Sequence, residues 1–211
     1  MSARSKLTTL LVAGLLMIAV VVVVLVGQGD DDGPDAPVVK TERLDRPDQV
    51  VEQGQPASVT METSEGDFTI ALDTERAPVT ANNFAYLAEQ GFYDGLGFHR
   101  IVPDFVIQGG DPLGDGTGGP GYKVVEAPPR DLEYTPGVVA MAKSGSEAAG
   151  TSGSQFYVVT GAGGRSLPPE YALVGKVESG MDVVEAIGAL GGADEQPTRD
   201  VVIEKATLVK G

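Results

Sequence analysis

The sequence contains no cysteine, and a single histidine, His99, stands among its 211 residues. Without cysteine, disulfides, thiolate metal sites and lipids attached through sulfur are excluded. One histidine also excludes any site that needs two imidazoles. Basic residues are scarce, 15 against 30 acidic ones, and the formal net charge is −15 at pH 7. Because a strongly negative surface repels the phosphate backbone, we expect no nucleic-acid partner.

Glycine and proline, in contrast, are abundant, with 29 and 14 residues. They follow no collagen-like period, so they indicate a fold with many turns, such as a barrel or a sandwich. The length suits one ordinary domain with additional segments.

The longest apolar run covers residues 7–26 and contains no charged residue. As a helix it would span about 30 Å, the thickness of a bilayer's hydrocarbon core. Arg4 and Lys6 precede the run, and aspartates at 30–32 follow it. Since basic residues stay on the cytoplasmic side, we expect a single-pass membrane protein with residues 1–6 in the cytoplasm and the remainder outside.

A cleaved signal peptide is the alternative for this run, and it would leave a secreted protein. Signal peptides place about 7–15 apolar residues before a small-x-small cleavage site. The run here is longer, and residues 24–31 offer no convincing site, so we predict an uncleaved anchor. Residues 27–55 are rich in Asp, Gly, Pro and Gln and predict a flexible tether. A short edge strand at Val50–Val51 stays open as an alternative there.

The rest of the chain has the pattern of a mainly β domain. Apolar and polar residues alternate over 59–63 and 68–72, which predicts a hairpin with its turn at Gly66. Helical spacing within 78–91, which begins with proline and ends with glycine, and again over 181–187 predicts two helices. Further short strands are expected at 98–101, 105–108, 137–141, 155–160, 173–177 and 201–209. Many short strands with few helices favour a closed antiparallel barrel.

Four blocks in this domain are more specific than any single short motif. They are GFHRIVPDFVIQGGDP at 97–112, GTGG at 116–119, VAMA at 139–142 and GSQFYV at 153–158. In this order they resemble the cyclophilin family of peptidyl-prolyl cis/trans isomerases, and the resemblance covers the whole folded part, residues 56–210. It implies an eight-stranded barrel capped by two helices. With the predicted anchor, the chain resembles a bacterial, membrane-anchored member.

The resemblance also implies which residues act. The family's catalytic arginine falls on Arg100, with Gln108 as its polar companion. The walls of the proline pocket fall on Phe105, Val106, Tyr157 and Leu167. Further substrate contacts are implied at Gly116, Ala142, Lys143, Ser144, Gln155 and Tyr171. His99 is expected to be structural, because isomerisation of proline moves no proton.

These residue types suit the chemistry of rotation about an X-Pro bond. The barrier arises from amide resonance and is about 18–20 kcal/mol. No bond is made or broken, so we expect no metal, cofactor or nucleophile. In the twisted amide the proline nitrogen regains a lone pair, and a guanidinium directed at it stabilises that state. An apolar pocket would hold the ring.

The chain departs from the usual family pattern at the pocket. It has no tryptophan, which many members place near the position of Leu167, and Tyr157 replaces the more usual phenylalanine. These departures motivate a second hypothesis, a non-catalytic module or chaperone of the cell envelope that only docks proline segments. The first hypothesis is a monomeric isomerase that acts on X-Pro segments of exported proteins.

Overall fold

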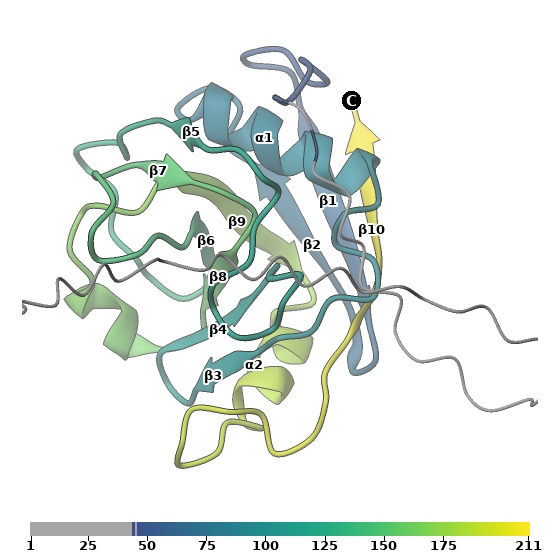
Figure 1. The fold of residues 1–211 in the computed structure, drawn as a ribbon, viewed down its shortest axis with the longest axis vertical. Helices are drawn as coiled ribbons and strands as arrows, with labels where there is room; N and C mark the ends of the chain where they lie inside the picture. The colour runs from purple at the N-terminus through teal and green to yellow at the C-terminus, as the bar shows by residue number, and fades with distance from the viewer. Residues whose placement is uncertain (1–43, 45) are drawn as a thin grey trace, which may run out of the picture. The chain divides into compact units, whose positions relative to one another are not determined.

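The computed structural model describes residues 44 and 46–211, and these form the domain drawn in colour in Figure 1. The predicted cytoplasmic end at 1–6 and the predicted membrane segment at 7–26 lie outside the described residues. Within the described part, no helix has the length and apolar character needed to cross a bilayer. The anchor therefore stays a prediction.

Eight strands form one antiparallel sheet in the order β10-β1-β2-β9-β6-β8-β4-β3. Their bounds are β1 Ala57–Thr63, β2 Gly66–Leu72, β3 Arg100–Val102, β4 Val106–Gly109, β6 Val138–Met141, β8 Phe156–Val159, β9 Leu173–Ser179 and β10 Ile203–Lys210. A separate pair joins β5 (Val124–Val125) and β7 (Thr151–Ser152). The mainly β prediction is confirmed, although β5 and β7 are too short to produce a readable alternation.

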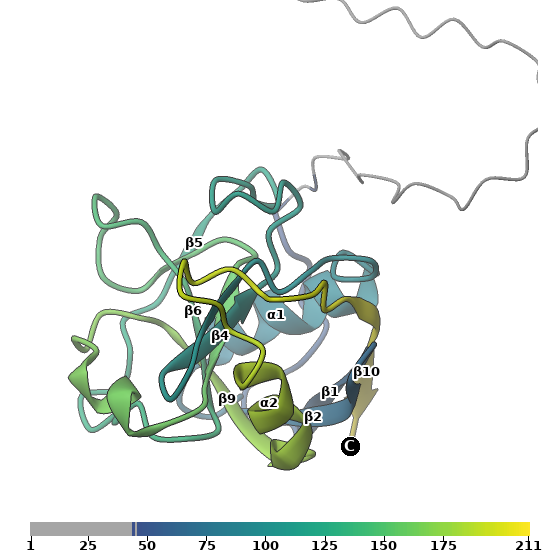
Figure 2. The same cartoon turned by 90° about the horizontal axis from the view of Figure 1, so that it is seen from below.

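The sheet curls without closing, so the prediction of a closed barrel is wrong (Figure 2). Within the described residues, β3 and β10 are the two ends of the hydrogen-bonded order and do not pair with each other. The segment before β3 nevertheless meets the start of β10, through an isolated bridge of Gly97 with Val202 and through backbone hydrogen bonds between residues 95–98 and residues 201–203. Strand β3 has only three residues, and its other edge is bonded by the loop before β10, because the Ile101 N–H donates to the Glu195 carbonyl at 2.8 Å.

The hairpin of β1 and β2 is confirmed, with its turn just before Gly66 instead of at it. Thr63 already pairs with Gly66, so Ser64 and Glu65 make the turn. The Thr63 hydroxyl donates to the Gly66 carbonyl at 2.6 Å. Gly66 has a φ of 119°, a conformation that glycine adopts without steric cost, and it becomes the first residue of β2.

Both predicted helices are present, α1 at Pro78–Glu89 and α2 at Met181–Gly188. They lie at opposite ends of the curled sheet (Figures 1 and 2). Pro78 occupies the first turn of α1, where its missing N–H costs nothing. The cap of α1 comes from far along the chain, because the Glu126 carboxylate accepts hydrogen bonds from Val79 N and Thr80 N. A 3₁₀ turn at Ala162–Ser166 follows β8.

Strand β8 is buried on both faces, and this positions the site. Phe156 and Val158 join the main core, where Phe156 packs edge-on against Phe84 and Tyr93. Tyr157 points the other way, into a second apolar cluster with Val106, Ala140 and Tyr134. Because successive strand residues alternate between faces, the same four residues supply the core and an outer pocket.

The described end of the segment predicted as a tether contacts the domain. Val50 and Val51 form no strand, but both backbone N–H groups donate to the Asn82 side-chain oxygen, at 2.7 and 3.1 Å. Asn82 in turn donates to the Asp48 carbonyl at 2.9 Å. Val51 is 3% exposed and belongs to the main core. The folded unit therefore begins no later than residue 48.

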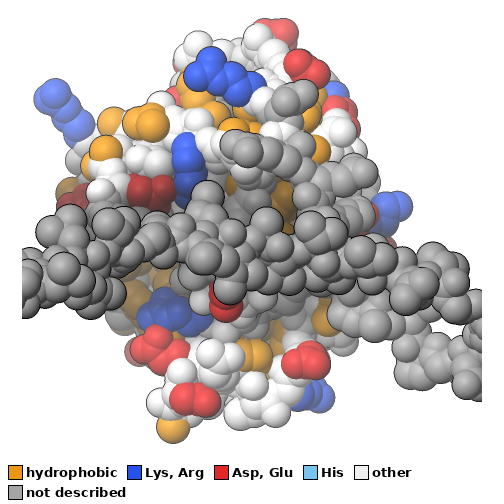
Figure 3. All heavy atoms as spheres, in the orientation of Figure 1, with side chains coloured by type: hydrophobic (Ala, Val, Ile, Leu, Met, Phe, Trp, Pro, Cys, Tyr) orange, Lys and Arg blue, Asp and Glu red, His pale blue; other side chains and the backbone are white. Residues whose placement is uncertain are grey.

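Charged and apolar side chains are interspersed on the face seen in Figure 3. Among the described residues, the exposed large apolar side chains are dispersed along the chain, at Val79, Leu113, Val125 and Val209. Single exposed apolar side chains are normal for soluble domains.

Candidate functional site

Strand register brings four residues into one row across the sheet. Arg100 on β3 pairs with Gln108 on β4, Gln108 pairs with Tyr157 on β8, and Tyr157 pairs with Ala140 on β6. Directly paired residues of antiparallel strands project to the same face. The row therefore carries the predicted catalytic arginine and the predicted pocket tyrosine on one side of the sheet.

A cavity of about 230 Å³ opens on this face. Nine residues line it, and all nine are predicted site residues: Arg100, Phe105, Val106, Gln108, Ala142, Lys143, Tyr157, Leu167 and Tyr171. Six of these side chains are aromatic or aliphatic. Of the three polar ones, Arg100 and Gln108 are neighbours in the row of paired strand residues, and Lys143 follows β6. We call this cavity the proline pocket.

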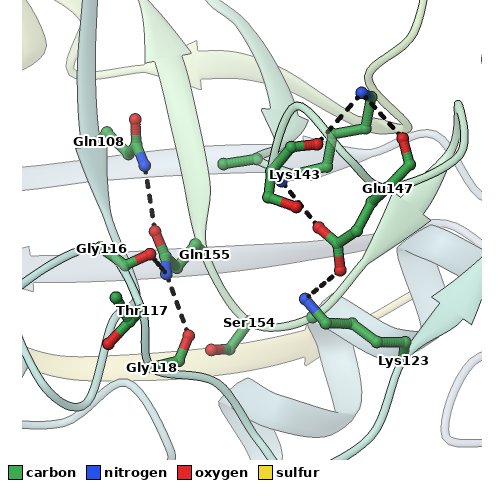
Figure 4. A pocket seen from close by; sticks show the side chains of 12 residues that line it. Gln108, Gly116, Thr117, Gly118, Lys123, Lys143, Glu147, Ser154 and Gln155 are labelled. Carbon is green, nitrogen blue, oxygen red and sulfur yellow. Dashed lines mark hydrogen bonds and ion pairs between the residues drawn. The ribbon is translucent and has the colours of Figure 1, made fainter.

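A chain of hydrogen bonds orients the polar side of the pocket. Arg100 Nη1 donates to Gln108 Oε1 at 3.5 Å, and Gln108 Nε2 donates to Gln155 Oε1 at 3.1 Å. Gln155 Nε2 donates to the carbonyls of Gly116 and Gly118, at 2.9 and 3.0 Å (Figure 4). Because each amide oxygen accepts from the preceding group, the orientation of both glutamines is fixed. The glycine loop thereby positions Gln108.

Arg100 has a second partner that sequence reasoning missed. Its Nε donates to Glu195 Oε2 at 2.7 Å. Glu195 lies in the loop between α2 and β10, outside every motif that carried the resemblance.

The aromatic wall of the pocket is supported from behind by Tyr134, which sequence reasoning also missed. Tyr157 and Tyr171 meet edge to face with ring centres 5.5 Å apart. The Tyr134 hydroxyl donates to the Tyr171 carbonyl at 2.8 Å and accepts from its N–H at 3.0 Å. Burial raises the pKa of Tyr134 to about 12, so the hydroxyl stays protonated and keeps both bonds at neutral pH.

The Tyr157 hydroxyl is buried and has no hydrogen-bond partner within the part of the chain that the structure describes. Burial raises its pKa far above the ordinary tyrosine value. A buried hydroxyl without a partner costs stability. This hydroxyl replaces a hydrogen of the phenylalanine that is usual in the resembling family.

A larger, polar cavity of about 460 Å³ adjoins the proline pocket, and we call it the polar cavity. It shares Gln108, Ala142 and Lys143 with the pocket and continues along two loops, with Gly116, Thr117, Gly118, Lys123, Ser144, Glu147, Gly153, Ser154 and Gln155 as its other lining residues. The predicted contacts Gly116, Ser144 and Gln155 lie here. No motif pointed to Lys123 and Glu147.

Glu147 organises the loop on the far side of the polar cavity. Its carboxylate bonds Lys123 Nζ at 3.0 Å and accepts from Ser144 N at 2.7 Å (Figure 4). Although burial raises its pKa, the hydrogen bonds from Ser144 and Lys123 lower it below the ordinary glutamate value. The carboxylate is therefore charged at neutral pH.

Lys143 stands between the two cavities with a side chain that is only 4% exposed. Its ammonium bonds Glu170 Oε2 at 3.0 Å and the Glu147 carbonyl at 3.2 Å, and it lies 5.7 Å from the centre of the Tyr171 ring. All of these are contacts within the protein, so the Lys143 side chain stabilises the loop that contains Glu147.

His99 lines neither cavity, although it precedes Arg100 in the chain. Burial lowers its pKa, and the charge of Asp111 opposes this only in part, so the imidazole is neutral at pH 7. The residues that the structure describes contain no group of three or more His, Asp or Glu side chains that could hold a metal.

Comparisons with known proteins agree with this geometry. The family model described as cyclophilin type peptidyl-prolyl cis-trans isomerase matches residues 58–208. The chain is 37% identical to peptidyl-prolyl cis-trans isomerase CYP18-2 of Arabidopsis thaliana over 162 residues, which cover 74% of this chain and 96% of the relative. It is 41% identical to peptidyl-prolyl cis-trans isomerase-like 1 of Bos taurus over 157 residues, 72% and 92% of the two chains.

Among solved structures, the chain is similar to a cyclophilin type peptidyl-prolyl cis-trans isomerase of Cryptosporidium parvum. The TM-score is 0.68 at 27% identity, over 74% of this chain and 99% of the other. A structure of the same protein in the presence of the dipeptide Ala-Pro gives a TM-score of 0.67 over 73% and 99%. Fold, family model and curated relatives coincide over the whole domain, and the chain belongs to the cyclophilin-type peptidyl-prolyl cis-trans isomerase family.

Proposed function

We propose that this isomerase accelerates rotation about X-Pro bonds by stabilising the twisted amide with the Arg100 guanidinium while the proline pocket holds the ring. The observation that carries the proposal is the shared cavity. Arg100 and Gln108 line the same 230 Å³ space as Phe105, Val106 and Tyr157. A cationic donor at the edge of an apolar slot suits a substrate whose reacting nitrogen belongs to an apolar ring.

Catalysis of this rotation requires only that the enzyme bind the rotated amide more tightly than the planar one. In the planar amide the proline nitrogen is a poor acceptor, whereas in the rotated state it regains a lone pair that a guanidinium N–H can reach. An interaction that forms only in the rotated state raises kcat. A rate increase of about 10⁵ requires about 7 kcal/mol of such stabilisation. A charged, pre-oriented donor in a partly dry cleft, together with positioning of the ring, supplies energies of this order.

Exchange spectroscopy on an Ala-Pro peptide tests the mechanism, because binding and exchange are read from one sample. The full chain in a mild detergent should speed cis/trans exchange, and Arg100→Ala should abolish most of that gain while the peptide still binds. Arg199→Ala is the matched control, since Arg199 pairs with Glu65 and lines neither cavity. An Arg100→Ala variant that exchanges the peptide as fast as wild type would overturn the mechanism. Binding without exchange in the wild type would favour a docking module instead.

We further propose that the domain is held outside the cytoplasm of a bacterial cell by the segment 7–26 and acts as a monomer on exported proteins. The support is the charge asymmetry of the sequence, with Arg4 and Lys6 before the run and aspartates after it. A site built within one chain also needs no second copy.

The absence of native cysteine makes this topology easy to test. A single cysteine introduced as Glu178→Cys, at an exposed position of β9, should react with a membrane-impermeant maleimide on intact cells. Ser5→Cys should react only after lysis. The reverse pattern would exclude the proposed orientation, and labelled protein in the medium would indicate cleavage and secretion.

A further inference from the structure

We propose that Glu195 is a positioning residue for Arg100, and this inference rests on the proposed function. Glu195 and Arg100 are 95 positions apart and meet through Oε2 and Nε at 2.7 Å, a shorter contact than the 3.5 Å from Arg100 Nη1 to Gln108. Their side chains are 52% and 35% exposed. An ion pair this exposed contributes little to folding stability, so its geometry calls for a functional account.

The backbone at Glu195 is held in an unfavourable conformation. Its φ is 63°, and among the residues that the structure describes only Asp104 is another non-glycine with positive φ. The left-handed conformation is costly for residues with a β-carbon, and it persists where the surroundings impose it, often at functional sites. Here the Glu195 N–H donates to the Gly192 carbonyl at 3.1 Å, and Gly192 N donates to Gln196 O at 2.7 Å. The loop is therefore a small closed turn.

This turn is fastened to β3 at two adjacent points. The Glu195 carbonyl accepts from the Ile101 N–H at 2.8 Å, while its carboxylate bonds Arg100, the preceding residue of the same strand. Because β3 is an end strand of the sheet, its free edge is available to the loop. The left-handed conformation allows carbonyl and side chain of one residue to reach neighbouring groups at this edge.

The result is a guanidinium held from two sides. Glu195 takes the Nε hydrogen, and Gln108 accepts one hydrogen from Nη1. A guanidinium has five N–H donors in one plane, so three remain for the substrate. Because the guanidinium is rigid and planar, holding Nε and Nη1 also fixes the direction of the remaining N–H groups. The reaction then does not have to bear the entropic cost of ordering this side chain. Glu195 contacts Arg100 and lines neither cavity.

Two variants at Glu195 separate orientation from charge. Glu195→Gln keeps an oxygen that can accept from Nε, whereas Glu195→Ala removes the acceptor and keeps a β-carbon at the same backbone position. We expect Glu195→Ala to lower kcat for the Ala-Pro peptide about tenfold with KM within about twofold, because the lost orientation matters in the rotated state. Glu195→Gln should retain at least about half of kcat. Glu89→Ala, which breaks the exposed pair with Lys210 at 2.9 Å, is the control and should leave kcat unchanged.

An NMR signal gives a readout apart from activity. The Arg100 Nε–H resonance of the full chain, identified by its absence from the Arg100→Lys spectrum, should be protected from solvent exchange in wild type and in Glu195→Gln. In Glu195→Ala the protection should be lost. Unchanged protection, or wild-type kcat in Glu195→Ala beside an impaired Arg100→Ala, would overturn the inference alone. An Arg100→Ala variant with wild-type kcat would overturn the proposed function and this inference together.

Discussion

The proline pocket and the polar cavity share Gln108, Ala142 and Lys143 but are built in different ways. The pocket, at about 230 Å³, is floored by strand residues whose positions follow from sheet register. The polar cavity, at about 460 Å³, is lined by loops held through side-chain contacts such as the pair of Lys123 with Glu147. The strand-built part thus has one geometry set by the ladder, whereas the loop-built part depends on individual polar bonds.

The first way to break this comparison is to cut the bond that joins the two cavities. Gln155→Ala removes the acceptor of Gln108 Nε2 and the donor to the glycine loop. With Gln108 free to rotate, we expect kcat/KM for an Ala-Pro peptide to fall about tenfold. Ser144→Ala is the matched change, because the bond from Ser144 to Glu147 uses the backbone N–H, and it should stay within about twofold. Equal effects of the two changes would contradict the role given to Gln155.

A second test compares two lysines that face the same loop. Lys143 is 4% exposed, while Lys123 is 49% exposed. Lys143→Met leaves the Glu147 carbonyl without its ammonium donor at a partly buried position, and we expect a loss of about 1–2 kcal/mol in the free energy of unfolding. Lys123→Met should cost less than about 0.5 kcal/mol. Urea denaturation of both variants measures the difference, and a larger loss at Lys123 would refute the argument.

A third test concerns the unpartnered hydroxyl in the pocket wall. Tyr157→Phe removes a buried oxygen that has no partner among the described residues, so we expect a gain of about 1 kcal/mol in stability. Peptide exchange should stay within about twofold, since the ring that lines the pocket is kept. A loss of stability would mean that the hydroxyl has a partner in solution.

The smallest expected effect is a pH dependence that comes from His99. Its pKa in the folded protein lies below the ordinary value, with burial as the main cause. The unfolded chain therefore binds the proton more readily, and stability should decline as pH falls below about 6.5 and level off below the folded pKa. Denaturation of His99→Gln between about pH 5.5 and 7.5 should show a flatter profile than wild type. An unchanged profile would mean that another group is responsible.

Much of the strand-built region could be predicted from the sequence. Alternation identified the hairpin of β1 and β2, and the block around Arg100 placed the site on adjacent strands. Seven of the nine residues of the proline pocket stand in or beside the four blocks, and the other two, Leu167 and Tyr171, were placed by the family resemblance. Of the loop-built cavity, only the residues implied by the family resemblance were predicted, because a loop has no period that a sequence pattern can reveal. Glu195, Tyr134 and Glu147 are ordinary residues until the chain folds.

The sequence by itself determined a mainly β domain of the cyclophilin-type family, because local periodicity and ordered motifs depend only on neighbouring residues. It also determined that Phe156 and Tyr157 face opposite sides, since strand residues alternate. Only the tertiary structure decided that the sheet stays open between β3 and β10 and that Glu195 holds Arg100 across 95 positions. Contacts at such separation depend on how the whole chain closes, and no local pattern encodes them.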